Sequence, residues 1–486
     1  DDAHRTFARA IEHLPDDAQT CQMLGEYLQS ALLDDLADRC LEKWASLAPD
    51  EPTRLVRRAG TLFDQRRYEE CAKLLEDGLR RHPNDARLRG RRAWLFERQH
   101  KYDLAKEEAE RALAINPDLA GPRVTLAKMI RRAGDLERAR AELERAARNS
   151  PGDPASETTA FTELGMVLDE LGEYPRAFEA FSHAQRAWLG RPSVQAISRD
   201  MLPQRIEAGR SIDWTGVVPQ WSAEHRSQRP APVFFMGFPR SGTTLVERML
   251  GSHPAFLATD ELPLATRLSI AAGRMTGDRR DLRGLDRLSA DQLRTLEEGY
   301  WTDADRHVPG LAASGRVLVD KMPMNMVALP FIRRVFPDAK ILMALRDPRD
   351  CILSNFMQEY RPNEAMVHMA SLESAAAIYA SVMDLWIHLR DTMDLDFLEY
   401  RYEDLTADTE TVARRILEFL GQPWDPEVLS FHKKASTEVV RTPSYQAVTK
   451  PVNRKAVGRW RRYAPQLEPV LPTIRRFVDL WGEPGA

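Results

Sequence analysis

The sequence predicts a multidomain chain of two fold classes: an all-α repeat solenoid, followed by an α/β domain with a parallel sheet. Three observations carry this prediction: a proline recurs every 34 residues, short apolar runs alternate with helical stretches after residue 231, and a glycine-rich loop follows the first run. We place the solenoid at residues 1–189, a linker at 190–230 and the α/β domain at 231–486. The recurring prolines are Pro15, Pro49, Pro83, Pro117 and Pro151.

Bulk composition limits the partners and the compartment. The 486 residues are too many for one ordinary core, and 43% hydrophobic with 29% charged residues is typical of a globular chain. The net charge of −4 gives no general attraction to nucleic acid, and no apolar run approaches the ~20 residues of a membrane span. The four cysteines lack metal or CxxC spacing, which indicates free thiols in a reducing compartment. We therefore expect a cytoplasmic protein without nucleic-acid or membrane partners. The composition leaves open whether the chain forms a homodimer.

The 34-residue period is that of the tetratricopeptide repeat, two helices closed by a proline-containing turn. Small residues stand twelve positions before each later proline, where the helices of a pair cross closely: Ala37, Cys71, Ala105 and Ala139. The stretch "ELGMVLDELGEYPRAFEAFSHAQRAW" repeats the pattern four residues late, so the array ends near Trp188. The opening "RTFARAIEHLP" resembles only a second helix, so the sequence begins within a repeat. Such repeats bind peptides or proteins, so we expect a peptide or protein acceptor or partner here.

Four strands are expected in the second domain, each followed by a helix. They lie in "PVFFMG", "RVLVDK", "AKILMAL" and "LDFLEYR". In a doubly wound parallel sheet, ligands bind at the carboxyl ends of the strands. Arg240, Lys321, Arg346 and Tyr402 lie at or just after such ends. These side chains are therefore candidates for one site.

The first of these loops, in "MGFPRSGTTLVERML", is a variant of a phosphate-binding loop. Gly237 and Gly242 have the Walker A spacing, but Thr243 stands where a nucleotide triphosphatase has Lys, and Arg240 supplies the charge. Backbone N–H groups and the helix dipole favour an anion at such a loop, and Arg can direct two donors to one oxyanion. No Walker B pattern is evident. We therefore expect a sulfonate-like ligand and no metal.

Two motifs together resemble sulfotransferases that use 3′-phosphoadenosine-5′-phosphosulfate. "FPRSGTTL" is similar to their 5′-phosphosulfate loop, and "RDPRDCILS" to their 3′-phosphate motif. The resemblance covers the chain from Val233 onward and is closest to tyrosylprotein sulfotransferases; both halves together resemble bacterial repeat-fused sulfotransferases. It implies that the donor, which leaves as adenosine 3′,5′-bisphosphate, is bound by Pro239, Arg240, Ser241, Gly242, Thr243, Thr244, Arg346, Ser354, Tyr402, Lys450, Asn453 and Arg459.

The same resemblance implies four catalytic residues, Arg240, Glu261, Lys321 and Ser444. Glu261 would be the general base, and Lys321 and Ser444 would stabilise charge on the leaving group. Asp260 is a rival base next to Glu261, and His253 and His307 are the next candidates. The chain departs from the family at Gln358, where the family has Arg, and the segment from Thr266 to Arg316 matches nothing in it.

The acceptor stays open at this point. A Glu base suits a protein tyrosine, but it also suits a carbohydrate or a small molecule. Two other classes remain: a kinase or nucleotide hydrolase with an altered loop, and a repeat scaffold whose enzyme domain is inactive. Thr243 and the Arg346/Ser354 pair argue against the first class. The complete catalytic set argues against the second.

Overall fold

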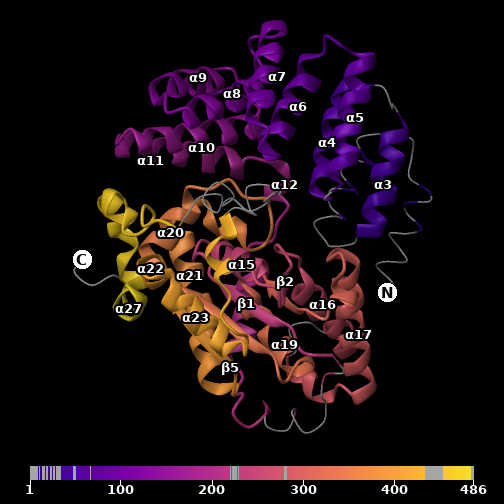
Figure 1. Cartoon of the computed structure of the whole chain (residues 1–486), viewed down its shortest axis with the longest axis vertical. Helices are drawn as coiled ribbons and strands as arrows, with labels where there is room; N and C mark the ends of the chain where they lie inside the picture. The colour runs from indigo at the N-terminus through magenta and orange to yellow at the C-terminus, as the bar shows by residue number, and fades with distance from the viewer. Residues whose placement is uncertain are drawn as a thin grey trace. The chain divides into compact units, whose positions relative to one another are not determined.

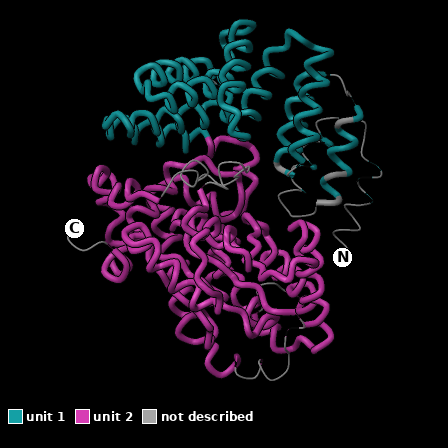
Figure 2. The backbone as a smooth tube through the Cα atoms, viewed as in Figure 1, with its two compact units in different colours: residues 1–187 teal, residues 188–486 magenta. Residues whose placement is uncertain are grey.

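The computed structural model divides the chain into two compact units, residues 1–187 and 188–486 (Figures 1 and 2). It describes residues 34–47, 51–65, 67–150, 152–218, 221, 227, 229–277, 282–432 and 452–482, with scattered positions before residue 34.

The first unit is a row of helix pairs, as the proline period predicts (Figure 1). Its helices are α3 (Asp34–Ser46), α4 (Pro52–Asp64), α5 (Tyr68–Arg81), α6 (Ala86–Arg98), α7 (Tyr102–Ile115), α8 (Ala120–Arg132), α9 (Leu136–Arg148), α10 (Pro154–Glu170) and α11 (Tyr174–Leu189). The carboxylates of Asp85 and Asp153 accept backbone N–H bonds at the starts of α6 and α10. The small residues Cys71, Ala105 and Ala139 are fully buried. The all-α solenoid is thus confirmed.

The second unit is built on a five-stranded parallel sheet with the order β2-β3-β1-β4-β5. Its strands are β1 (Val233–Gly237), β2 (Phe256–Ala258), β3 (Val317–Lys321), β4 (Lys340–Leu345) and β5 (Asp396–Arg401). The four expected strands are present. β2 was not expected, because three residues are too few for a periodic signal. All five residues of β1 are buried, as expected for a central strand with both faces covered.

Further helices belong to the second unit, and those between β1 and β5 in the sequence connect its strands (Figure 1). They are α12 (Pro192–Gln195), α13 (Met201–Arg210), α15 (Thr243–Ser252), α16 (Leu264–Thr276), α17 (Ala290–His307), α18 (Leu311–Ser314), α19 (Leu329–Val335), α20 (Pro348–Phe356), α21 (Leu372–Thr392), α22 (Tyr402–Ala407), α23 (Thr409–Phe419), α26 (Ala464–Leu467) and α27 (Leu471–Trp481). Short 3-10 turns include η5 (Arg459–Tyr463). The unmatched segment 266–316 supplies most of α16 and all of α17 and α18.

The expected linker differs from the observed division of the chain. The second unit begins at Trp188, so α12 and α13 belong to it. Leu202, Ile206 and Trp214 are buried, and α13 contacts α21. These apolar side chains pack within the second unit, because exposing them to water would cost free energy.

The four cysteines are free and buried. Within the ranges given above, the helices are all too short or too polar to cross a membrane.

Candidate active site

The loop between β1 and α15 has a backbone that only particular residues tolerate. Gly242 has φ +86°, and a Cβ atom on it would lie 2.3 Å from Cδ2 of Tyr402. Arg240 also has a left-handed φ, of 71°. The first position therefore requires glycine, and the second holds a bulky residue in a strained conformation of the kind found at ligand sites.

Helix α20 anchors this loop from the neighbouring strand connection. Asn355 Nδ2 donates to the Pro239 carbonyl at 2.9 Å, and Tyr360 OH donates to Asn355 Oδ1 at 2.7 Å. The Ser241 hydroxyl lies 3.4 Å from the Cys351 sulfur. Two residues predicted for the loop are therefore held by α20: Pro239 through its backbone carbonyl and Ser241 through its side chain. Asn355 was not predicted, although it directly follows Ser354 in the sequence.

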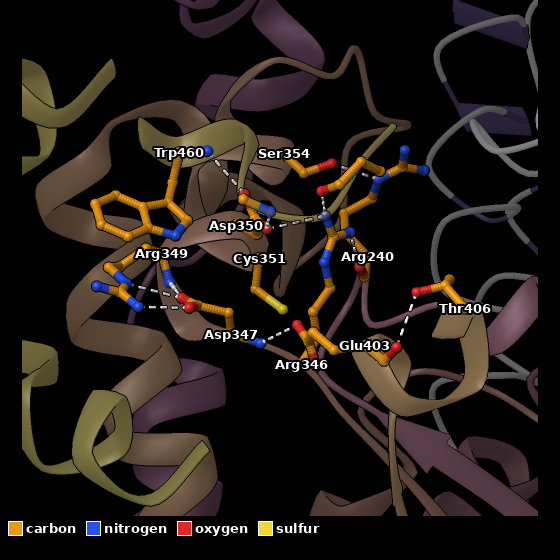
Figure 3. A network of polar contacts seen from close by, with 12 residues as sticks. Arg240, Arg346, Asp347, Arg349, Asp350, Cys351, Ser354, Glu403, Thr406 and Trp460 are labelled. Atoms are coloured by element: carbon orange, nitrogen blue, oxygen red, sulfur yellow. Dashed lines mark hydrogen bonds and ion pairs between the residues drawn. The ribbon is translucent and has the colours of Figure 1, made fainter. Parts of the chain in front are cut away.

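Arg240 points toward the other expected anion motif (Figure 3). Its Nε donates to Ser354 Oγ at 3.0 Å. Burial lowers the pKa of the Arg240 guanidinium, and the charges of Arg346 and Arg459 lower it further, against opposing effects of Tyr360 and Tyr402. Three arginines thus gather near the loop, an arrangement that an anion would stabilise.

Arg346 lies where the sequence predicts, at the carboxyl end of β4, but its terminal nitrogens bind protein carbonyls. Nη1 donates to Arg240 O at 2.9 Å and Nη2 to Ala456 O at 2.5 Å. The guanidinium also lies over the Tyr402 ring, 4.7 Å from its centroid. Its Nε is buried and has no hydrogen-bond partner among the described residues. Arg346 therefore braces the loop and keeps one donor uncommitted.

Asp350 attaches the C-terminal segment to this site (Figure 3). Its carboxylate accepts the backbone N–H groups of Gly458 at 2.7 Å and Trp460 at 2.8 Å. The Arg349 guanidinium stacks on the Trp460 ring at 3.7 Å. Arg459, which lies between the two bonded N–H groups, is thereby held within electrostatic range of Arg240. The sequence shows Asp350, but the contact of its carboxylate with the backbone of Gly458 and Trp460 could not be predicted from the sequence.

A second cluster lies at the ends of β3 and β2. Lys321 Nζ donates to Glu261 Oε1 at 2.6 Å and forms an ion pair with Glu247 Oε2 at 3.0 Å. The Lys321 side chain is 0% exposed, whereas that of Glu261 is 32% exposed. Burial opposes the charged form of Lys321, but Glu247 and Glu261 outweigh it and raise the pKa of Lys321. The structure thus brings Lys321 and Glu261 together and adds Glu247, which was not predicted.

The turn that carries Glu261 is unusual in its backbone. Asp260 and Glu261 both have left-handed φ, at 53° and 63°. Asp260 N–H donates to Glu247 Oε1 at 2.9 Å, and the Asp260 carboxylate accepts from Arg248 Nη2 at 3.0 Å. Lys321 N–H donates to Thr259 Oγ1 at 3.1 Å. These bonds hold the turn against α15 and β3 and direct the Asp260 carboxylate to Arg248.

The rival acid–base groups have structural partners. His253 Nε2 lies 3.0 Å from the Pro423 carbonyl, and its Nδ1 accepts Ala255 N–H at 3.1 Å, so both ring nitrogens have backbone partners. His307 hydrogen-bonds to Asp303, which raises the pKa of His307 despite partial burial. Asp320 is directed away from Lys321 by the alternation of the strand and accepts from Tyr300 OH at 2.9 Å.

The remaining predicted residues divide into three groups. Thr243 and Thr244 begin α15 and are buried. Asn453 lies on an exposed turn, where its Oδ1 accepts Lys455 N–H at 3.2 Å. Ser444 and Lys450 lie outside the described residues. Across the described ranges, His, Cys, Asp and Glu side chains form no group of three suited to a metal ion.

An α/β domain with an arginine-lined loop after its first strand is an arrangement suited to a phosphate- or sulfonate-bearing ligand. Residues 232–426 match the model of the sulfotransferase family, and residues 56–120 and 125–192 match that of the tetratricopeptide repeat. The chain therefore combines a region that matches the tetratricopeptide repeat with a region that matches the sulfotransferase family.

Three individual proteins illustrate what the chain is similar to. An uncharacterized protein of Aquifex aeolicus (strain VF5) is 28% identical over 67% of this chain and 43% of its own length, so the match spans less than half of it. Protein-tyrosine sulfotransferase A of Caenorhabditis elegans is 26% identical over 51% of this chain and 67% of its own. The solved sulfotransferase domain of the Synechococcus PCC 7002 olefin synthase is 22% identical, with a TM-score of 0.37, over 52% of this chain and 97% of its own.

Proposed function

We propose that this protein transfers a sulfonate group from 3′-phosphoadenosine-5′-phosphosulfate to a hydroxyl acceptor, with protein tyrosine as the first acceptor to test. One observation carries the proposal. The Lys321–Glu261 pair and the arginine-lined loop lie at the carboxyl ends of neighbouring parallel strands of one sheet. A general base and an anion site next to each other are what the transfer of an anionic group to a hydroxyl requires.

The residues present fit the donor. Arg240, Arg346 and Arg459 supply positive charge, and the partnerless Arg346 Nε is a buried donor without an acceptor among the described residues. Gly242 lies directly against the Tyr402 ring, which leaves the loop backbone without a side chain at that point. Arg240, Ser354 and the loop would hold the phosphosulfate and 3′-phosphate, and Tyr402 would contact the adenine side. When bound, the donor supplies an activated sulfonate group.

Proton transfer is assigned to Glu261. Its partly exposed carboxylate can reach an acceptor hydroxyl, whereas Glu247 is buried. As the acceptor oxygen bonds to sulfur, the hydroxyl proton passes to Glu261 and the sulfur–oxygen bond to the phosphate breaks. Lys321, and Ser444 by resemblance, would stabilise the negative charge that the leaving phosphate gains. No covalent enzyme intermediate is needed.

Tyrosine is favoured as acceptor by the similarity of the chain to the protein-tyrosine sulfotransferases of C. elegans and Danio rerio. The repeats support a peptide or protein acceptor, because such arrays bind extended chains. A carbohydrate or small phenol remains the alternative acceptor.

The donor assignment is tested with the purified chain. Adenosine 3′,5′-bisphosphate should raise the thermal midpoint equally with and without EDTA, because ligand binding to the folded state stabilises it. Labelled sulfonate transfer to a tyrosine peptide, a glycan and a small phenol then identifies the acceptor class. Stronger stabilisation by ATP–Mg²⁺ than by the bisphosphate would show that the donor is wrong.

A further inference from the structure

Glu247 is a buried carboxylate that connects the two reacting groups, and the mechanism above does not use it. It lies on the inner face of α15, one turn after Thr243 at the helix start, and is 1% exposed. Its Oε1 accepts the backbone N–H of Asp260 at 2.9 Å. Its Oε2 forms the 3.0 Å ion pair with Lys321, at angles outside hydrogen-bond geometry. One side chain thus binds both the turn of the base and the catalytic lysine.

A buried carboxylate is costly unless it is paired, so this position requires a physical reason. Lys321 is fully buried and therefore needs compensating negative charge throughout a reaction cycle. Glu261 compensates Lys321 only while it is ionised, and the proposed mechanism protonates Glu261. After that step, Glu247 is the remaining carboxylate, among the residues that the structure describes, in contact with the ammonium.

We propose that Glu247 is a positioning residue for sulfonate transfer, which holds the Lys321 ammonium and the Glu261 turn in place while Glu261 accepts the proton. This inference rests on the proposed function. Glu247 would be a third member of the cluster that Lys321 and Glu261 form at the ends of β3 and β2. It links this cluster to α15, the helix that begins at the anion loop.

The charge state of Glu247 supports a measurable pH dependence. Burial raises its pKa to about 7; Lys321 and Arg248 oppose the rise, and Asp260 and Glu261 add to it. The charge of Glu247 also raises the pKa of Asp320 on β3, so these two carboxylates oppose each other's ionisation. Below about pH 7 a protonated Glu247 no longer attracts the ammonium electrostatically, so the turnover number should fall as the pH falls through this value.

The role is tested by a kinetic double-mutant cycle with Glu247→Gln and Lys321→Met. Glu247 contacts Asp260 N–H and Lys321 through different carboxylate oxygens, and Gln keeps only one oxygen and loses the negative charge. Alone, Glu247→Gln should lower kcat for transfer to a tyrosine peptide by roughly 10- to 100-fold and leave bisphosphate affinity within about 3-fold. In the Lys321→Met background it should cause little further loss. An equal loss in both backgrounds would overturn the proposal, because Glu247 would then act independently of Lys321.

The pH profile separates positioning from a general loss of structure. The kcat step near pH 7 should be absent in Glu247→Gln. Asp320→Asn is the matched control, because Asp320 is another fully buried carboxylate whose pKa burial raises to about 7, and it binds Tyr300 instead of Lys321. We expect this control to keep the step and to displace it to lower pH, because the Asp320 charge no longer opposes the ionisation of Glu247. Loss of the step in the control, or its persistence in Glu247→Gln, would contradict the role.

A double-mutant cycle of thermal unfolding tests the contact between Glu247 and Lys321 without the need for transfer activity. Each single variant leaves a buried charge with fewer partners, so the thermal midpoint of the double variant should fall by less than the sum of the two single losses. Additive losses would show that Glu247 does not hold Lys321. A wild-type protein that neither binds the bisphosphate nor transfers sulfonate would instead contradict the proposed function, and the stability cycle would still test the contact.

Discussion

Arg240 Nε and Ser354 Oγ form a 3.0 Å hydrogen bond that joins the loop after β1 to the helix after β4. The resemblance assigns these residues to two different ends of the donor. Under the proposed function, an oxyanion of the donor would compete with the Ser354 hydroxyl for Arg240. Because the two side chains are in contact, the effects of Arg240→Ala and Ser354→Ala can be compared directly.

We expect Arg240→Ala to weaken bisphosphate binding and to lower kcat by roughly 10²–10³-fold, because it removes the charged donor of the loop. Ser354→Ala should weaken bisphosphate binding by about 10-fold or less, since it removes one neutral hydroxyl. Calorimetric titration with the bisphosphate measures both affinities. A Ser354→Ala effect as large as that of Arg240→Ala would mean that Ser354 mainly serves to orient Arg240.

Glu261→Gln should abolish most transfer and leave bisphosphate affinity nearly unchanged, because Gln keeps the size of the side chain and loses the basicity. The matched control is Asp260→Asn, one residue away. Asn accepts the left-handed backbone at this position, and the carboxylate that it replaces binds Arg248. The control should keep substantial activity. If only the control loses activity, the base is Asp260.

Gly242→Ala should destabilise the loop for two reasons. The left-handed φ of +86° strains any side chain, and the new Cβ would lie 2.3 Å from the Tyr402 ring. Gly277→Ala is the control, because its φ is +96° and nothing lies within 4 Å of the added Cβ. The control should lose about 1–2 kcal/mol from backbone strain alone. Gly242→Ala should lose more stability in thermal unfolding and should also weaken bisphosphate binding.

Asp320 provides a pH test of stability. Burial raises its folded-state pKa from 3.8 to about 7, so the folded chain binds a proton more tightly than the unfolded chain. The resulting stabilisation is present below about pH 4 and is lost as the pH rises to about 7, at about 1.4 kcal/mol for each pH unit between the two pKa values. Asp320→Asn removes this dependence. Relative to wild type, its thermal midpoint should therefore rise between pH 5 and pH 8, and an unchanged difference would show that Asp320 titrates normally.

The sequence by itself determined the class of both domains. The 34-residue period requires helix pairs, because each pair must bury its apolar face on the next one. The apolar runs of β1, β3, β4 and β5 are long enough to be identified without tertiary information. The loop residues, Arg346 and Lys321 could be named because they follow strand ends, whereas Ser354 and Glu261 were predicted from the resemblance to sulfotransferases.

Only the tertiary structure decided which of these groups touch. Glu247 reads as an ordinary helical residue in "TTLVERML", and its role depends on Lys321, 74 residues later, and on a backbone N–H that has no sequence signature. Asp350 likewise binds the backbone of Gly458 and Trp460. Residues 192–218 could not be assigned to the second unit from the sequence, because their packing depends on contacts with distant helices such as α21. Local patterns specify elements, whereas buried charge pairs and backbone acceptors arise only when distant segments meet.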